Sequence, residues 1–281
     1  MEKLAISDPA EVYEQYLGRP IADPFTLLLL EGAPPALGAT VLDLACGTGS
    51  VARHVAPMVG NNGRVVALDV NPAMLAVGRA AAIPAGATIE WRQGDAMKLD
   101  MPSGAFDLIY CQQGLQFFSD RIAAAQEMRR VLRPAGRVII SVWQDLSRHP
   151  VYAALFEAVG RHLDVPISDL DVSFSLSDPK ELRRILRSAG FRDIEIMPRS
   201  LDVTLAPPEL FVELTVLGAV TSVPAFARLA PATQASLVDK ISAEMNPLIQ
   251  DYTKDEKLTF PMHTNIARAF AGDHADQRGA L

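Results

Sequence analysis

Short apolar segments alternate with longer amphipathic segments along the first half of the chain. The apolar segments occupy residues 41–44, 64–69, 89–95, 106–111 and 137–143. Between them, apolar residues recur at helical spacing, as they do from Ile122 to Leu132. Strands that alternate with helices in this way predict an α/β fold with a doubly wound, mostly parallel sheet.

Both ends of the chain depart from this rhythm. Residues 8–32 predict two helices separated by Gly18-Arg19-Pro20. After residue 190 the pattern predicts a strand at 193–205, helices within 207–252 and a last strand at 258–269. A helical insertion between the last two strands suggests a lid, and a helical pair that merely covers the sheet is the alternative.

The first apolar segment leads into a turn of small residues, Ala45-Cys46-Gly47-Thr48-Gly49, and Ser50 is placed to cap the helix that follows. A strand, a glycine turn and a helix N-terminus let a ligand lie against backbone amides. Gly47-x-Gly49-x-x-Ala52 also satisfies the dinucleotide pattern, which leaves a nicotinamide or flavin site open.

Three acids favour a different nucleoside. Asp43 lies inside the first strand, where a buried carboxylate needs hydrogen-bond donors or a cation. The next two strands also end in acids, and Asp69 suits two ribose hydroxyls while Asp95 suits an adenine amino group. Because no second phosphate-binding turn follows, a single nucleoside fits better than a dinucleotide.

Five motifs occur in order between residues 41 and 143: VLDLACGTG, VVALDVNPAML, GDAMKLDMP, FDLIYCQQGLQFF and LRPAGRVIISVW. This set resembles the class I S-adenosylmethionine (SAM)-dependent methyltransferases, in the small-molecule branch of ubiquinone/menaquinone-biosynthesis type (methyltransferase type 11). The resemblance implies a Rossmann-like, seven-stranded sheet. It also implies SAM as cofactor, S-adenosylhomocysteine as product, and methyl transfer to a small molecule.

With this resemblance the chain divides into four expected parts. Residues 1–36 form an N-terminal helical cap and residues 37–206 the SAM-binding core. Residues 207–257 form the helical lid insertion, and residues 258–281 the last strand and tail.

The resemblance also implies ten cofactor-binding residues. The amino-acid end of SAM is expected at Ala45, Gly47, Gly49, Gln112 and Tyr16, and the nucleoside at Asp69, Val70, Met74, Asp95 and Ala96. Asp43 ties the turn together or meets the ligand. Several of these residues also have an alternative role that does not involve a ligand. Gly47 and Gly49 would be ordinary turn glycines, and Asp69 would cap the following helix. Met74 would be a core residue, Asp95 a solvated loop acid, and Tyr16 a core or surface residue.

The acceptor side is less defined. Gln113, Gln116 and Phe117 follow the fourth strand and are expected to face the acceptor, unless Phe117 and Phe118 are core residues. Five apolar lid residues suggest an apolar or aromatic substrate: Leu210, Phe211, Leu214, Leu217 and Phe226. Oxygen is the favoured acceptor atom, with carbon and nitrogen as alternatives.

No catalytic residue can be named from the sequence. His149 is the best-placed candidate for a general base, a solvated loop histidine being the alternative, and His263 is a weaker candidate. His54 is expected to be structural. We expect no metal, because neither a catechol-type magnesium set nor zinc-ligand spacing is present.

Composition limits partners and location. The 281 residues carry a net charge of −7, which argues against nucleic acid as a partner. No apolar run is long enough to span a membrane, and the early acids Glu2, Asp8 and Glu11 argue against a signal peptide. Cys46 and Cys111 are expected to be reduced, in a cytoplasmic protein that acts alone or as a homodimer.

Two other functions remain open from the sequence. One is a protein of the same fold that binds SAM without methylating, either structurally or to catalyse a rearrangement. The other, less favoured, is an NAD(P)-dependent oxidoreductase.

Overall fold

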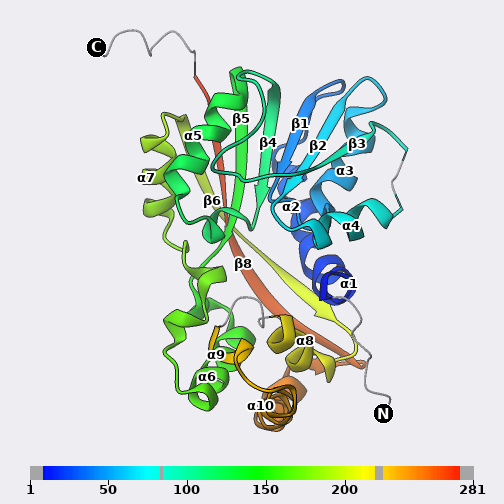
Figure 1. The fold of residues 1–281 in the computed structure, drawn as a ribbon, viewed down its shortest axis with the longest axis vertical. Helices are drawn as coiled ribbons and strands as arrows, with labels where there is room; N and C mark the ends of the chain where they lie inside the picture. Colours follow the sequence, from blue (N-terminus) through cyan, green and yellow to red (C-terminus); the bar gives the residue numbers. More distant parts are fainter. Residues whose placement is uncertain (1–8, 83–84, 219–223, 273–281) are drawn as a thin grey trace.

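The computed structural model describes residues 9–82, 85–218 and 224–272. Its sheet has the strand order β3-β2-β1-β4-β5-β8-β6, with β7 paired to β8 outside this path (Figure 1). The strands are β1 (Thr40–Leu44), β2 (Arg64–Asp69), β3 (Ile89–Gln93), β4 (Phe106–Gln112), β5 (Leu132–Trp143), β6 (Arg192–Leu205), β7 (Thr253–Lys254) and β8 (Lys257–Phe270). β1 to β5 are parallel, and β8 is antiparallel to both of its neighbours. The doubly wound, mostly parallel sheet is therefore confirmed.

The sheet has eight strands, whereas seven were expected. The additional strand is β7, which forms a two-residue hairpin with the start of β8. Asp255 and Glu256 at its tip both have positive φ, 50° and 59°. Two consecutive residues in this conformation make the turn that matches the twist of a tight hairpin.

Helices cover both faces of the sheet (Figure 1). They are α1 (Pro9–Tyr13), α2 (Asp23–Gly32), α3 (Ser50–Val59), α4 (Pro72–Ala80), α5 (Arg121–Val131), α6 (Pro150–Leu163), α7 (Pro179–Ser188), α8 (Leu210–Gly218), α9 (Pro224–Ala227) and α10 (Pro231–Asp251). α5 and α7 pack on one face of the sheet, and α2 and α3 on the other.

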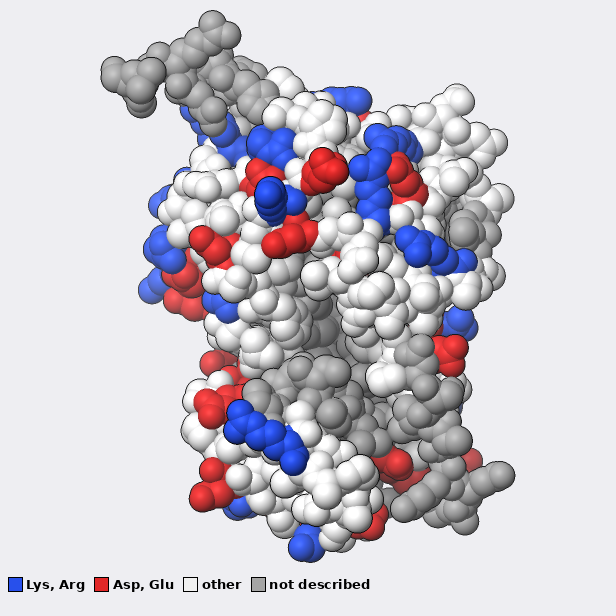
Figure 2. Space-filling model, viewed as in Figure 1, with Lys and Arg blue, Asp and Glu red and all other residues white. Residues whose placement is uncertain are grey.

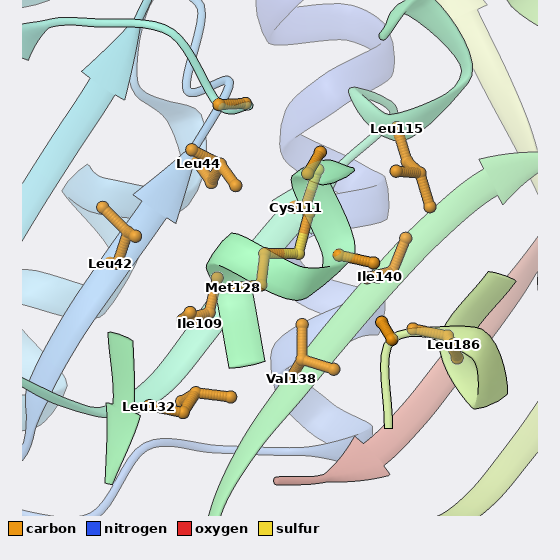
Figure 3. Packing of buried hydrophobic residues seen from close by; sticks show 14 of the residues in the cluster. Leu42, Leu44, Ile109, Cys111, Leu115, Met128, Leu132, Val138, Ile140 and Leu186 are labelled. Carbon is orange, nitrogen blue, oxygen red and sulfur yellow. The ribbon is translucent and has the colours of Figure 1, made fainter. Parts of the chain in front are cut away.

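The alternation of side chains along β1 explains this layering. Leu42 and Leu44 join the apolar cluster under α5 and α7, which also contains Met128 and Leu186 (Figure 3). Val41 joins the cluster under α2 and α3. Successive strand residues point to opposite faces, so Asp43 also points towards α3.

A second group of helices lies beyond one end of the sheet. β6 and β8 stay paired from Arg192 and Phe270 to Leu205 and Leu258, and they extend into the group formed by α6, α8, α9 and α10 (Figure 1). A separate apolar cluster fills this group. We call this group of helices, with the ends of β6 and β8, the helical half. The SAM-binding core was expected to span residues 37–206 and so to include the residues of α6, but α6 packs against α10 in the helical half.

The N-terminal helices were expected to be separated at Gly18-Arg19-Pro20, and this was wrong. The chain stays helical from Pro9 to Gly32, with a π-helix, η1 (Glu14–Ala22), between α1 and α2. Pro20 lies inside this π-helix. The wider π turn accommodates a proline ring that would clash in an α-helix.

Within the described residues, no helix has the length and apolar character needed to cross a membrane. On the face shown in Figure 2, lysines and arginines are interspersed with acids over the sheet half, and the middle carries few charged side chains. This face therefore offers no continuous basic surface of the kind that binds nucleic acid.

Candidate cofactor and acceptor site

The glycine turn after β1 leaves open space beside the backbone at one glycine only. Ala45, Gly47 and Gly49 all have positive φ, 56°, 55° and 86°. A Cβ atom at Gly47 would meet nothing within 4 Å, whereas one at Gly49 would meet the Trp91 ring at 2.3 Å. Gly47 thus offers bare backbone to a ligand, and Gly49 permits close packing of the turn against β3.

Asp69, at the end of β2, binds this turn directly. Its Oδ2 accepts a hydrogen bond from the Gly47 N–H at 2.8 Å, and its Oδ1 accepts one from the Asn71 N–H at 2.8 Å. Each carboxylate oxygen has a further lone pair. The structure therefore brings Asp69 and Gly47 together, with acceptor capacity left for two ribose hydroxyls, which remains the predicted role of Asp69.

The predicted adenine side continues along the ends of β2 and β3. Val70 is 69% exposed, which is unusual for a valine next to a strand end, and Met74 is half-buried. Asp95 is exposed and accepts the Met97 N–H at 2.8 Å, while Ala96 is buried. An exposed apolar side chain beside an exposed acid suits a flat ring with a polar edge.

Asp43 is buried, with 1% of its surface exposed, and its Oδ2 accepts the Ala52 N–H of α3 at 2.9 Å. Burial, the largest cause, and the negative charge of Asp69 together raise the pKa of Asp43 to about 7, against the lowering effects of the Ala52 N–H and the Arg53 charge. This bond holds the glycine turn to α3, which favours the structural alternative for Asp43.

The raised pKa gives a testable pH dependence of stability. The folded protein keeps a proton on Asp43 between pH 4 and 7, where an unfolded aspartic acid has lost it. The stability that this group contributes is therefore complete below about pH 4 and is lost as the pH rises through about 7. We expect the free energy of unfolding of the wild type, relative to Asp43→Asn, to fall between pH 5 and pH 8. Urea denaturation at four pH values measures this, and a constant difference would contradict it.

The cap helices are joined to the glycine turn by Glu14, which is 6% exposed. Its Oε2 accepts the Thr48 hydroxyl at 2.5 Å, and its Oε1 pairs with Arg53 at 2.9 Å and with Arg19 at 3.3 Å. Glu14 was not among the residues predicted from the sequence. One acid among polar neighbours carries no local signal, and its partners Thr48 and Arg53 lie more than thirty residues away along the chain.

Removing the charge of Glu14 should loosen the cap. A hydrogen-bonded charge contributes about 1.5–3 kcal/mol, and glutamine keeps part of the bonding, so we expect Glu14→Gln to lower the free energy of unfolding by about 1–2 kcal/mol. The matched control is Glu11→Gln, because Glu11 is exposed on the preceding helix. Equal urea midpoints for the two variants would show that the Glu14 contacts do not stabilise the cap.

A second set of hydrogen bonds joins α2 to α3 and to the end of β4. Asp23 accepts the Ser50 hydroxyl, and Thr26 lies 2.8 Å from the same hydroxyl. Thr26 also donates to Gln112 Oε1 at 2.9 Å, and Gln112 Nε2 donates to Ala22 O at 2.9 Å. The Gln112 side chain is therefore engaged by the cap, which leaves its backbone for the predicted contact with SAM.

Tyr16 and Tyr13 lie three residues apart, and the structure places them in different surroundings. Tyr16 lies beside the end of β6 and α8, where it lines a cavity of about 10 Å³ with Phe211. Tyr13 turns its hydroxyl inwards, and burial followed by the charges of Glu14 and Asp69 raises its pKa to about 12. The structure thus brings Tyr13 to the strand-end acids, and a role for Tyr16 in binding SAM stays a prediction.

His149 is buried rather than solvated in a loop, and His263 lies in β8, as the sequence indicated. His149 has no exposed surface, its Nε2 accepts the His263 N–H at 2.9 Å, and its Nδ1 lies 3.0 Å from Asp145 O. Burial lowers the pKa of His149. Both ring nitrogens are thus engaged by backbone, and this arrangement favours a structural role for His149 at the end of β5 and β8 over both sequence interpretations, the candidate general base and the solvated loop histidine.

The described part of the chain holds no group of three or more His, Cys, Asp or Glu residues suited to a metal ion. Cys46 and Cys111 are free thiols, and burial raises the pKa of Cys111 to about 12.

On the acceptor side, Gln116 is buried and Phe117 is 52% exposed, so Phe117 is not a core residue. Phe118 is half-buried against the α5–α7 cluster. The lid residues Phe211, Leu214 and Phe226 are buried, Leu210 is half-buried, and the Leu217 side chain lies outside the described residues. Packing within the helical half therefore accounts for Phe211 and Phe226, which join its apolar cluster.

Comparisons with known proteins agree with this geometry. Residues 41–136 match the family described as "Methyltransferase domain". The ubiquinone/menaquinone biosynthesis C-methyltransferase UbiE of Coxiella burnetii is 44% identical over 105 residues, which are 37% of this chain and 42% of that protein. The protein of the same name from Enterobacter sp. (strain 638) is 31% identical over 172 residues, 56% of this chain and 68% of that protein.

Among solved structures, the YcgJ protein of Bacillus subtilis has a TM-score of 0.57 at 18% identity, covering 88% of this chain and 98% of that chain. That likeness concerns the fold alone. The match spans only about two-fifths of the length of the Coxiella protein, but more than two thirds of the Enterobacter protein. The chain therefore belongs to the class I SAM-dependent methyltransferases, in the branch that includes the ubiquinone/menaquinone-biosynthesis proteins.

Proposed function

We propose that this protein transfers a methyl group from SAM to a small organic acceptor. The observation that carries the proposal is the open backbone at Gly47, hydrogen-bonded to the Asp69 carboxylate at the end of the neighbouring strand. An uncrowded turn beside a strand-end acid fits the amino-acid end and the ribose of one nucleoside.

The charge around the turn supports SAM over NAD(P). After burial, the charges of Glu14, Asp23 and Asp69 raise the pKa of Tyr13. Arg53 and Arg19 both pair with Glu14, so Asp23 and Asp69 are the acids that give the site its negative charge. A negative site attracts a sulfonium cation and repels a pyrophosphate. The α3 N-terminus, where a dinucleotide pyrophosphate would bind, carries Ser50 with its hydroxyl donated to Asp23.

Each predicted ligand residue then has a physical task. Backbone groups at Gly47 would bind the amino-acid end of SAM, and Asp69 would bind the ribose. Val70 would pack against the adenine ring, and Asp95 would accept a hydrogen bond from the adenine amino group. SAM supplies a methyl group already activated by its positive sulfur. The protein's part is to align the acceptor and exclude water, and alignment alone is worth about 7–11 kcal/mol of barrier in favourable systems.

For the acceptor, we propose a small, apolar or aromatic molecule. Oxygen was the atom favoured by the sequence, but the relatives from Coxiella and Enterobacter are named C-methyltransferases. A phenolic ring reconciles the two, because it offers a hydroxyl oxygen and an activated ring carbon beside it. Carbon therefore joins oxygen as a proposed methylation site.

The test uses SAM labelled with ¹³C in its methyl group. The purified protein is incubated with labelled SAM and a panel of phenols, naphthols and cell-extract fractions, and S-adenosylhomocysteine and labelled products are measured. The NMR shift of the new methyl group separates O–CH₃ from C–CH₃. Tight SAM binding with no S-adenosylhomocysteine formed would favour a non-methylating protein, and binding of NAD(P) without SAM an oxidoreductase.

A further inference from the structure

A chain of three side chains lies where β4 and β5 end, beside the middle of β8, which runs antiparallel to β5. Gln116 Nε2 donates to Gln113 Oε1 at 3.4 Å, and Gln113 Nε2 donates to Thr264 Oγ1 at 3.1 Å. Thr264 in turn donates to Val142 O at 2.8 Å. The chain starts in η2 (Leu115–Phe117), directly after β4, and ends in β8.

The direction of the hydrogen bonds in this chain is determined at its Val142 end. A carbonyl oxygen can only accept a hydrogen bond, so the Thr264 hydroxyl donates its one hydrogen to Val142 O. The same hydroxyl must therefore accept the hydrogen bond from Gln113. Gln113 then presents Oε1 to Gln116, which must donate through Nε2. Consequently Gln116 Oε1 is left as a hydrogen-bond acceptor.

This oxygen has no hydrogen-bond partner within the described structure, although Gln116 is only 2% exposed. Leaving a buried acceptor unsatisfied is costly, and native proteins seldom do so without a reason. Gln113 adds a second cost, because its φ of 52° is unfavourable for a residue with a side chain. An unsatisfied acceptor and an unfavourable backbone conformation in one cluster indicate a site where a bound ligand supplies the missing hydrogen-bond donor.

A second unpartnered atom lies on the neighbouring strand. Ser141 Oγ is buried without a partner in the described residues. In the register of β5 and β8, Trp143 is opposite Thr264. Side chains alternate along a strand, so Ser141 and Trp143 share the face of Thr264. Polar atoms that can accept or donate thus occur on both β4 and β5 where these strands end.

The surroundings of the cluster are aromatic. η2 packs against η5 (Val172–Phe174). The rings of Phe174 and His149 lie 4.8 Å apart, and Trp143 continues the ring contacts on the other side of His149 at 6.2 Å. A flat ring with one hydrogen-bond donor would suit an unsatisfied acceptor that lies near aromatic side chains.

We propose that Gln116 Oε1 receives the hydroxyl hydrogen of a phenolic acceptor, and that Gln113 and Thr264 hold Gln116 in the orientation that does so. The inference rests on the proposed methyl transfer and names its acceptor class. It holds whether the methyl group goes to the phenolic oxygen or to a ring carbon, because the hydroxyl identifies the ring in both cases.

Two probes of nearly the same shape test this proposal: 1-naphthol, which carries the O–H, and 1-methoxynaphthalene, which lacks it. Their dissociation constants are measured by calorimetry with the protein saturated with S-adenosylhomocysteine. We expect the wild type to bind 1-naphthol about tenfold more tightly, as one hydrogen bond to a buried acceptor implies. In Gln116→Met this ratio should fall to about one, with S-adenosylhomocysteine affinity unchanged.

Gln144→Met is the matched control. Gln144 is also buried, but its Nε2 donates to Thr264 O at 2.9 Å, so its amide is satisfied within the protein. We expect this control to lower Tm and to keep the tenfold ratio, whereas Gln116→Met should keep or raise Tm. A lowered Tm with an unchanged ratio in Gln116→Met would assign Gln116 a structural role and overturn the proposal.

Two further results would also overturn it: no preference between the probes in the wild type, or binding of neither probe while S-adenosylhomocysteine is bound. Failure to bind S-adenosylhomocysteine is a different result. It would remove the proposed function, and this inference with it.

Discussion

Asp69→Asn should weaken the binding of SAM and of S-adenosylhomocysteine about 100-fold. Each hydrogen bond to a charged group contributes about 1.5–3 kcal/mol, and the variant loses the charge that would accept both ribose hydroxyls. Asparagine also replaces one oxygen by an amide that cannot accept, so either Gly47 N–H or Asn71 N–H loses its acceptor. Titration calorimetry with S-adenosylhomocysteine measures the change.

Asp107→Asn is the control for Asp69. Asp107 Oδ2 also accepts a backbone N–H, that of Thr40 at 2.8 Å, but near the opposite end of β4 from Gln112. Its replacement should affect stability and leave S-adenosylhomocysteine affinity within about twofold of the wild type. Similar affinities for both variants would show that Asp69 does not bind the ribose.

Alanine at Gly47 and at Gly49 should have different consequences, although both glycines have positive φ. At Gly49 the new Cβ would lie 2.3 Å from the Trp91 ring, and we expect Gly49→Ala to lower the free energy of unfolding by more than about 3 kcal/mol. At Gly47 it would enter open space. Gly47→Ala should therefore cost only about 1 kcal/mol of stability and abolish S-adenosylhomocysteine binding.

Urea denaturation and calorimetry on the two variants separate these effects. The double variant Gly49→Ala/Trp91→Leu checks the cause, since removing the indole should recover part of the lost stability. The explanation fails if the double variant is destabilised by the full sum of the two single substitutions. It also fails if Gly47→Ala binds S-adenosylhomocysteine with the affinity of the wild type.

The sheet and the strand-end acids could be predicted because their signals are local. Alternating apolar residues define β1, β2 and β4, and an acid directly after an apolar run is placed at the carboxyl edge by the parallel arrangement alone. The glycine turn was recognisable for the same reason, since small residues between a strand and a helix N-terminus are contiguous in sequence. These features include Gly47, Asp69 and Asp95.

The missed features depend on distant partners. Glu14 becomes important only because Thr48 and Arg53 reach it across the fold. His149 looked like a solvent-facing residue after a strand, but its nitrogens meet Asp145 and His263 in the interior. The π-helix could not be predicted because Gly18 and Pro20 usually end a helix, and no local sequence pattern distinguishes the wider turn of a π-helix.

The segment between β6 and β8 leaves the sheet and returns to it at one place. Leu205 and Leu258 face each other as an antiparallel pair, so the backbone ends of this 52-residue stretch stand only about 5 Å apart. Closing so small a gap needs no more than a short hairpin turn. Replacing the stretch from 206 to 257 by such a turn should therefore leave β6 and β8 paired as they are, while α6 would lose its contact with α10.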